Sequence, residues 1–297
     1  MKQDIKSLLN TYQKTKKPLN PKTLKFIGVE GFDVYNPSAP FMYQGKELII
    51  ARVEKRDSEV SKAVYFEKTE DAYIKRVDLK TLDLQDPCVT SFKEEYVVGG
   101  TYVFHEDNKT FWFTRFYKGS DLNQLTHFVD APMGMKDVRF QMLNDGRVAI
   151  FTRPQGIKGG RGKIGFTIAD SVSSVTTELI DQAPLFDQFI DSEWGGANHL
   201  TLLDEHTIGV LGHIANFSEG DIRHYYAMTF KVDILSREAS KMKIIAIRDD
   251  FNEGPAKRPD LVDVLFAAGI VEQDEKYVLY VGVSDAEVQT IEVIEPF

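Results

Sequence analysis

One pattern recurs five times along this chain and limits the folds that it can adopt. In each copy a polar residue precedes a short apolar run, a turn follows, and a second strand-like run ends in a polar side chain. Clear copies are KDVRFQMLNDGRVAIFTR and ANHLTLLDEHTIGVLGH. The leading polar residues are separated by 50, 51, 61 and 62 positions: Asn36, Asp86, Asp137, Asn198 and Asp260. Self-similarity with a period of this size is typical of propellers and other repeat folds.

The segments between the leading residues are rich in short β-type runs. Examples are KELIIARVEKR, TFWFTRFYK and YVLYVGVSD, in which β-branched and aromatic residues predominate. Turn residues such as Gly45 and Asp145-Gly146 separate many of these runs. Units of about 50–60 residues correspond to propeller blades of about four strands. We therefore predict an all-β fold, a five-bladed β-propeller in one domain of residues 1–297, with blades starting near residues 36, 86, 137, 198 and 260.

Propeller geometry makes a prediction about the leading residues. The first strand of each blade lines the central axis and runs in the same direction, so equivalent positions surround one funnel. The alternative is a generic two-sheet β protein in which the spacing is accidental. A sandwich of that kind would scatter the same residues over both ends and both faces.

The N-terminal segment predicts a short amphipathic helix. Ile5, Leu8, Leu9 and Tyr12 fall at helical spacing, and Pro18 stops the pattern. The segment has no apolar stretch long enough for the core of a signal peptide. No other part of the chain approaches the roughly 18 apolar residues of a membrane span. We therefore expect a cytoplasmic protein.

Charge and cysteine content exclude several classes of protein. The formal net charge is −9, whereas binding to nucleic acid or to an anionic membrane favours a basic surface. We therefore expect neither nucleic acid nor membrane as a partner. Cys88 is the one cysteine, so an intramolecular disulfide framework is excluded.

Charged side chains gather at the leading positions and at strand ends. Cleavage of a glycosidic bond by water generally uses two carboxylates, one that protonates the leaving oxygen and one that acts as nucleophile or base. Cleavage by phosphate needs one carboxylate and a cluster of cations that holds the phosphate dianion. The repeat offers the carboxylate of Asp86, and its basic candidates are Arg52, Arg115, Arg153, His213, Lys136 and Arg139. This mixture predicts a site for a sugar and a phosphate in the funnel.

Each candidate also has a purely structural interpretation. An aspartate before proline, as in Asp86-Pro87, is common in Asx turns. Arg52 and Arg153 would suit exposed strand ends, and His213 would suit a hydrogen-bonded core position. Recurrence at equivalent blade positions favours function for the group as a whole. Because the chain has no Cys/His grouping for zinc and no G-x-S-x-G motif, we expect neither a metal site nor a serine hydrolase.

The order of these motifs resembles a known group of enzymes. YNPSAPF, ARVE, QDPCVTSF, KDVRFQ, FTRP, EWGGANHLTLL and VLYVGVSD are similar to the successive blade motifs of the five-bladed β-mannoside phosphorylases and mannosidases. Within that group the chain most resembles the compact β-1,2-mannosyltransferase/phosphorylases, from Gly31 to Ile291. The resemblance implies inverting phosphorolysis of a β-mannoside to α-mannose 1-phosphate, the reverse synthesis, and possible use of a nucleotide-mannose donor.

The resemblance also implies roles for individual residues. Asp86 matches the family's acid, which passes its proton through a sugar hydroxyl to the glycosidic oxygen. The surrounding motif is usually E-D-P-R, and here Gln85 and Cys88 stand in place of the Glu and the Arg. The implied phosphate-binding residues are Arg153, His213, Lys136 and Arg139. The implied sugar-binding residues are Asp285, Asn36, Arg52, Asn198 and Asp137.

We therefore expect a β-1,2-mannoside phosphorylase with inorganic phosphate as co-substrate and no cofactor. Its partners would be a β-mannoside oligosaccharide and either phosphate or mannose 1-phosphate. Two alternatives stay open. One is a glycoside hydrolase on the same propeller, with Asp137 or Asp260 as the second carboxylate. The other is a non-catalytic sugar-binding propeller. The sequence indicates no particular oligomeric state.

Overall fold

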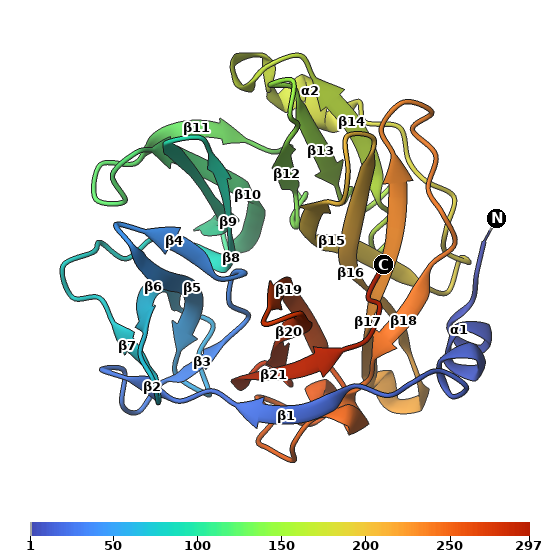
Figure 1. Ribbon diagram of the computed structural model, residues 1–297, viewed down its shortest axis with the longest axis horizontal. Coiled ribbons are helices and arrows are strands. Elements are labelled where there is room, and N and C mark those ends of the chain that lie inside the picture. Colours follow the sequence, from blue (N-terminus) through green and yellow to red (C-terminus); the bar gives the residue numbers. More distant parts are fainter. Residues whose placement is uncertain (1) are drawn as a thin grey trace.

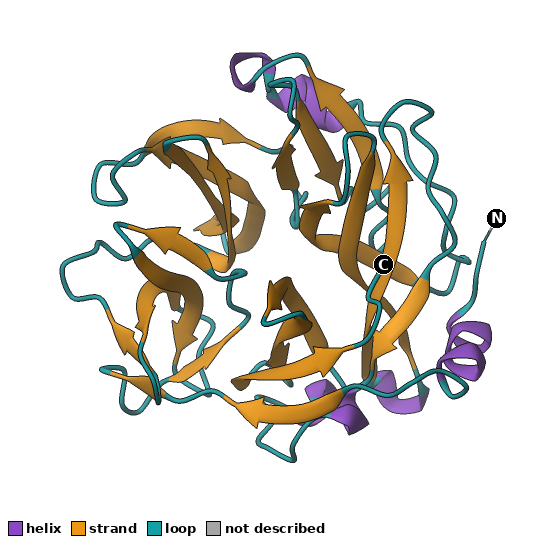
Figure 2. Ribbon diagram, in the orientation of Figure 1, coloured by secondary structure: helices purple, strands orange, loops and turns teal. Residues whose placement is uncertain are grey.

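Five β-sheets surround a central axis in the computed structural model, which describes residues 2–297 (Figure 1). Strands dominate the chain, and the helices are short and lie outside the ring of sheets (Figure 2). Neighbouring strands within the sheets pair in antiparallel fashion, apart from one short parallel pair at the outer edge of one sheet. The predicted five-bladed β-propeller with a short N-terminal helix is therefore confirmed.

The first three blades follow one another along the chain. The strands of the first blade are β2 (Phe26–Ile27), β3 (Asp33–Tyr35), β4 (Phe41–Tyr43), β5 (Lys46–Glu54), β6 (Ser61–Lys68) and β7 (Tyr73–Lys75). Those of the second blade are β8 (Gln85–Phe92), β9 (Glu95–Glu106), β10 (Lys109–Gly119) and β11 (Thr126–Asp130). Those of the third blade are β12 (Arg139–Met142), β13 (Val148–Thr152) and β14 (Gly165–Ala169).

The last two blades complete the ring. The strands of the fourth blade are β15 (Trp194–Leu202), β16 (Thr207–Phe217), β17 (Arg223–Asp233) and β18 (Lys243–Ala246). Those of the fifth blade are β19 (Leu265–Gln273), β20 (Lys276–Val283), β21 (Glu287–Val293) and the N-terminal β1 (Leu19–Thr23). The helical segments are α1 (Ile5–Tyr12), α2 (Thr177–Asp181), η1 (Val172–Ser174), η2 (Glu219–Asp221), η3 (Arg248–Asp250) and η4 (Pro259–Leu261).

Helix α1 is the amphipathic helix that the spacing of apolar residues predicts. Asp4 caps its N-terminus, because the Asp4 Oδ1 atom accepts a hydrogen bond of 2.9 Å from the Ser7 backbone N–H. Ile5, Leu8 and Tyr12 are buried in an apolar cluster with residues of the third and fourth blades. Within residues 2–297, no helix has the length and apolar character needed to cross a membrane.

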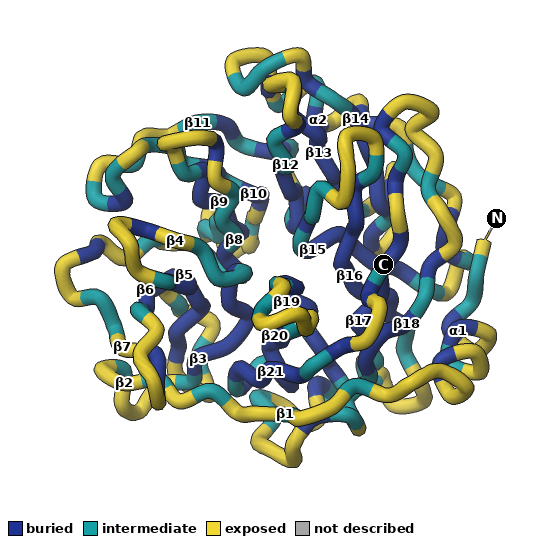
Figure 3. Tube along the Cα trace, viewed as in Figure 1, coloured by how far each residue is buried: buried dark blue, intermediate teal, exposed yellow. Residues whose placement is uncertain are grey.

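Apolar clusters fill the seams between neighbouring blades. Leu48 and Ile50 of β5 pack with Val98 of β9 between the first and second blades. Leu211 of β16 and Leu279 of β20 belong to the corresponding cluster between the fourth and fifth blades. Burial is accordingly greatest in the inner strands, whereas the connecting loops at the periphery and the outer strand β1 are exposed (Figure 3). The hydrophobic effect therefore holds the blades together at their faces, and polar side chains are free to line the axis.

Several residues at or next to the ends of the innermost strands adopt a left-handed backbone conformation. The φ angle is 45° at Asn36, 50° at Asp86 and 60° at Asp137. Asn and Asp tolerate this region better than other side chains with a Cβ atom. The strand pairing also shifts register at Asp86 in β8 and at Asn198 in β15. Bulges of this kind re-aim side chains, which explains why polar residues lead the repeats.

The fifth blade departs from the predicted pattern. Asp260 lies in the 3-10 turn η4, and the innermost strand β19 begins only at Leu265. The register shift of this strand falls at Ala268, so an apolar residue stands where other blades have a polar one. The axial carboxylate of the fifth blade is instead Asp285, in the turn after β20, with a φ angle of 50°.

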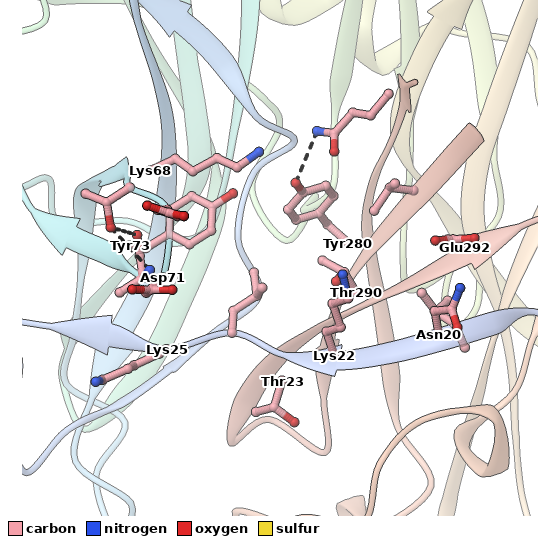
Figure 4. Close-up of a pocket in the computed structure, with 17 residues that line it drawn as sticks. Asn20, Lys22, Thr23, Lys25, Lys68, Asp71, Tyr73, Tyr280, Thr290 and Glu292 are labelled. Carbon is pink, nitrogen blue, oxygen red and sulfur yellow. Dashed lines mark hydrogen bonds between the residues drawn. The ribbon is translucent and has the colours of Figure 1, made fainter. Parts of the chain in front are cut away.

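The first strand of the chain closes the ring by pairing with the last blade. β1 runs antiparallel to β21, with Leu19 opposite Glu292 and Lys22 opposite Thr290 (Figure 1). A pocket of about 330 Å³ lies beside this seam, between β1 and β21 on one side and Tyr73 of β7 on the other (Figure 4). Because the chain runs from β1 directly into β2 of the first blade, this pairing ties the start of the first blade to the fifth blade.

We predict that a disulfide across this seam stabilises the fold. In a Leu19→Cys/Glu292→Cys variant, the two cysteines would lie opposite each other on adjacent strands. Cα atoms of directly opposed residues are about 4.5–5.5 Å apart, which is within the range of a disulfide. Oxidation should raise the Tm relative to the same variant kept reduced, because a typical disulfide contributes about 2–4 kcal/mol. Equal melting temperatures for the two forms would show that opening of the seam does not limit stability.

Candidate active site

A cavity of about 240 Å³ opens at one end of the axis, and all five blades contribute to its lining. Many of the predicted site residues meet here. The lining residues that the sequence predicts are Asn36, Asp86, Lys136, Asp137, Arg153, His213 and Asp285. The remaining lining residues are Arg223, Tyr225, Arg258, Leu261, Val264 and Phe266.

Two carboxylates and an amide form the acidic side of the cavity. The Asn36 Nδ2 group donates hydrogen bonds to Asp86 Oδ1 at 2.9 Å and to Asp285 Oδ1 at 3.3 Å. Asn36 belongs to the first blade, Asp86 to the second and Asp285 to the fifth. The amide therefore holds the two carboxylates side by side, although Asn36 and Asp285 are 249 positions apart in the sequence.

Arg52 lies behind Asp86 and is absent from the cavity lining, contrary to the expected direct contact with sugar. Its Nη1 atom is 3.4 Å from Asp86 Oδ1, and its Nη2 atom is 3.0 Å from Glu54 Oε2. Glu54 is only 1% exposed and is also bonded by Lys257 and by the Tyr35 hydroxyl. Buried charges require such partners, because desolvation is costly. The geometry gives Arg52 the role of orienting Asp86.

The two carboxylates of the acidic side differ in environment. Asp86 has Arg52 as a cationic partner, whereas Asp285 accepts a hydrogen bond from the neutral Asn36 amide. Burial and the nearby negative charge of Asp86 raise the pKa of Asp285 above its ordinary value. Neighbouring carboxylates in unlike environments are the usual arrangement for acid catalysis.

The opposite side of the cavity is basic. Arg153, which follows β13, donates from Nη1 to Asp137 Oδ2 at 3.1 Å and from Nε to the Gly195 carbonyl at 2.9 Å. A Cβ atom on Gly196 would lie 2.6 Å from Arg153 Cδ, so the glycine leaves room for this arginine. Burial disfavours the charged form of Asp137, but Arg153 and the nearby lysine and arginine outweigh it and hold the pKa of Asp137 below its usual range.

Arg139 and Asn198 lie beside this basic side rather than in the cavity lining. The Arg139 Nε atom donates to the Asn198 backbone carbonyl at 2.7 Å, and Nη2 is 3.9 Å from Asp137 Oδ1. Both residues line a neighbouring cavity of about 180 Å³, together with Cys88. Arg139 therefore adds positive charge near Asp137, whereas Asn198 contacts the site only indirectly, by its hydrogen bond to His213.

His213 enters the site as a neutral imidazole. Its Nδ1 atom is hydrogen-bonded to Asn198 Oδ1 at 2.8 Å, and its ring stacks on Tyr225 with centroids 5.1 Å apart. Burial, and next the positive charge of Arg153, lower the pKa of His213 to about 3. A positively charged histidine is therefore not part of the basic side, and the cationic character comes from Arg153, Lys136 and Arg139.

The rim of the cavity contains residues that sequence reasoning did not assign. Arg223 and Arg258 line the cavity and both form ion pairs with Asp260, so Asp260 contributes through these two arginines. Arg115, a predicted basic candidate, is instead paired with Asp130 at 2.8 Å and is absent from the lining. Arg223 and Arg258 occupy no repeated motif position. The sequence signal for these two arginines is weak, since an arginine at a strand start or in a loop is usually solvated.

The arrangement provides two complementary chemical environments in one cavity. On the acidic side, a pair of carboxylates can exchange a proton with a leaving oxygen. On the basic side, the buried Arg153 and the half-buried Lys136 can hold an anion by charge-assisted hydrogen bonds. The two sides come from different blades, so a substrate in the cavity would contact both.

Comparison with known proteins places the chain in a family. Residues 11–297 match the family described as "Protein of unknown function (DUF1861)". The chain belongs to this family. No curated protein matches the chain significantly.

Solved structures similar to this member of the DUF1861 family include two Leishmania mexicana enzymes. A mannose phosphorylase in complex with phosphate is 34% identical, with a TM-score of 0.91 over 99% of this chain and 93% of that one. A GDP-Man-dependent mannosyltransferase is 30% identical, with a TM-score of 0.90 over 99% and 94%. The predicted resemblance and the prediction of a glycosyl-transferring enzyme are thereby confirmed.

A more distant structure has the same fold. The β-1,2-mannobiose phosphorylase of Listeria innocua is 15% identical, with a TM-score of 0.63 over 89% of this chain and 90% of that one. At this identity the likeness concerns the propeller itself.

We predict that Asp285→Asn raises stability at neutral pH. The native state keeps a proton on Asp285 to higher pH than the unfolded chain does, so the free energy of unfolding falls as pH rises from about 4 through the raised pKa. Asparagine does not ionise and removes this loss. The Tm gain should be absent below about pH 4 and reach a few degrees at pH 7, at ~2–4 °C for each kcal/mol.

The matched control for this prediction is Asp107→Asn. Asp107 is exposed and has a φ angle of 48°, close to the 50° of Asp285, so both substitutions place asparagine in the same backbone conformation. A pH-dependent gain in the control, or a Tm difference for Asp285→Asn that is independent of pH, would contradict the assignment of Asp285 as the destabilising carboxylate.

Proposed function

We propose that the protein is a β-1,2-mannoside phosphorylase, which uses inorganic phosphate as co-substrate and no further cofactor. The observation that carries this proposal is the division of one 240 Å³ cavity into a carboxylate side and a cationic side. The mannose phosphorylase and the mannosyltransferase similar to this chain support mannose as the transferred sugar.

In the proposed reaction the bond between the anomeric carbon and the glycosidic oxygen breaks, and its electron pair leaves with the oxygen. Asp86 supplies the proton that this oxygen takes up, either directly or through a hydroxyl of the mannosyl unit. A phosphate oxygen attacks the anomeric carbon from the opposite face and gives α-mannose 1-phosphate. Asn36 and Arg52 hold the Asp86 carboxylate in place, and Asp285 is positioned beside it to contact the mannosyl unit.

The phosphate in this proposal is held by the basic side. Arg153 and Lys136 line the cavity, and Arg139 adds charge from behind Asp137. Arg153 is fixed by Asp137 and by the Gly195 carbonyl, so its remaining N–H groups are oriented before phosphate binds. Pre-oriented charge in a buried site stabilises an anion more than exposed charge does.

Hydrolysis is less well supported by the same geometry. A hydrolase needs a carboxylate that activates water on the side opposite the acid. Asp137 is the carboxylate on that side, but it is ion-paired with Arg153, and the pKa of Asp137 is lowered. A carboxylate of low pKa is a weak base.

A second candidate activity is mannosyl transfer from a nucleotide-mannose. The similarity to a GDP-Man-dependent mannosyltransferase favours it, as do Arg223 and Arg258 at the cavity rim. A nucleotide donor carries a second phosphate group, and guanidinium groups beyond the first phosphate site suit its recognition. Mannose 1-phosphate and a nucleotide-mannose would then both donate a mannosyl unit to the same acceptor.

The test of the proposed function is incubation with β-1,2-mannobiose, with and without inorganic phosphate, followed by product analysis. We expect α-mannose 1-phosphate and mannose only when phosphate is present. Release of mannose without phosphate would identify a hydrolase. Absence of turnover with both β-1,2-mannobiose and GDP-mannose would identify a sugar-binding propeller. GDP-mannose with a mannose acceptor tests the second activity in parallel.

We predict that Asp86→Asn abolishes phosphorolysis without unfolding the protein. The carboxamide has nearly the same shape but delivers no proton, and general acid catalysis typically contributes on the order of 10²–10⁴ in rate. The matched control is Asp83→Asn, since Asp83 is exposed three positions earlier in the chain. A turnover number within a few-fold of the parent, in a variant that melts normally, would exclude Asp86 as the acid.

We predict that Arg153→Ala weakens the use of phosphate by about 10- to 100-fold in KM, because a charge-assisted hydrogen bond contributes roughly 1.5–3 kcal/mol. The KM for mannobiose should change much less. Arg115→Ala is the matched control, because it also removes an arginine paired with an aspartate, but outside the cavity. Unchanged phosphate dependence in a folded Arg153→Ala variant would refute the assignment of the phosphate side.

A further inference from the structure

The imidazole of His213 has one nitrogen paired and the other facing the cavity without a protein partner. Nδ1 is 2.8 Å from Asn198 Oδ1, and Nε2 is buried with no hydrogen-bond partner among the described residues. The residue is only 2% exposed and lines the cavity beside Arg153 and Lys136. A buried polar atom without a partner is costly, and at a binding site it indicates a group that the ligand supplies.

The pairing with Asn198 determines which nitrogen carries the proton. The Asn198 Oδ1 atom has no hydrogen and can only accept, so His213 Nδ1 is the donor in this bond. In a neutral imidazole the other nitrogen then carries a lone pair. Nε2 therefore presents an acceptor to the cavity.

The charged groups around the ring keep it neutral. The positive charges of Arg153, Lys136 and Arg139 favour the neutral ring, and the carboxylate of Asp137 opposes them. Tyr225 covers one face of the ring. Burial, and next the positive charge of Arg153, lower the pKa of His213 to about 3. Protonation of Nε2 at neutral pH is therefore disfavoured.

We infer that His213 selects the protonated form of the bound oxyanion, with Nε2 accepting a hydrogen bond from the P–OH group of hydrogen phosphate. This inference rests on the proposed function and assigns to one side chain the recognition of the phosphate proton. Inorganic phosphate carries at least one proton at neutral pH, whereas sulfate has the same tetrahedral shape and carries none. Sulfate in this position would place an oxygen lone pair against the Nε2 lone pair.

The same contact orients the nucleophile. When the P–OH group points to His213, the unprotonated phosphate oxygens are left for Arg153, for Lys136 and for the anomeric carbon. An unprotonated oxygen is the better nucleophile, so the histidine would direct the reactive oxygens away from itself. No proton needs to leave His213 for the reaction to proceed.

The test is calorimetric titration of the sugar-free protein with phosphate and, separately, with sulfate at pH 7 and constant ionic strength. We expect sulfate to bind at least about 10-fold more weakly than phosphate, because an unmatched buried acceptor loses at least that factor. Equal affinities for the two anions, or no binding of either, would overturn the inference. The comparison needs no substitution, so it does not depend on the folding of a variant.

Two variants test whether His213 is the cause. Asn198→Asp replaces the amide with a carboxylate that stabilises a doubly protonated imidazole, which turns Nε2 into a donor. His213→Gln supplies an amide that can donate. Both should reduce the preference for phosphate over sulfate to within about three-fold, mainly by improving sulfate binding. An unchanged preference in a folded variant of either kind would overturn the inference.

The inference and the proposed function fail differently. If phosphate is preferred over sulfate but no phosphate-dependent turnover of mannobiose occurs, the recognition of hydrogen phosphate stands and the proposed reaction is wrong. If mannobiose is phosphorolysed but sulfate binds as tightly as phosphate, the reaction stands and the role of His213 is wrong.

Discussion

Pairing of β1 with β21 is the interaction on which the site depends. It joins the N-terminal strand to the last blade and so holds the first and fifth blades together. The acidic side of the cavity spans this boundary, because Asn36 of the first blade bonds to Asp285 of the fifth. Without closure the two carboxylates would have no common partner. Closure of the ring therefore both stabilises the fold and positions the two carboxylates of the acidic side.

Residues with a left-handed backbone conformation supply the polar side chains of the candidate active site. Asn36, Asp86, Asp137 and Asp285 all have φ angles between 45° and 60°. Such conformations persist only where the surrounding structure enforces them, and they are common at functional sites. Here the blades enforce them, and the short polar side chains that tolerate them project into the cavity. Backbone strain and chemical function thus favour the same residue types at these positions.

The sequence predicted the fold and part of the site where strand patterns recur at regular spacing. The repeat predicted the five blades, with Asp86 and Asp137 at leading positions and Arg153 at a strand end. It placed Asp260 at a blade start, whereas β19 begins at Leu265 and the axial carboxylate is Asp285. Partners such as Glu54 and Lys257 were not predictable, since their contact joins a strand to a loop 203 positions away. Tertiary packing alone creates that buried pair.

One cavity separates proton donation from anion binding in the proposed reaction. A crystal structure of the protein with phosphate and β-1,2-mannobiose tests this separation most directly. We expect phosphate against Arg153, Lys136 and His213, and a mannosyl unit between Asp86, Asp285 and the phosphate. Phosphate bound instead on the side of Asp86 and Asp285, or outside this cavity altogether, would contradict it.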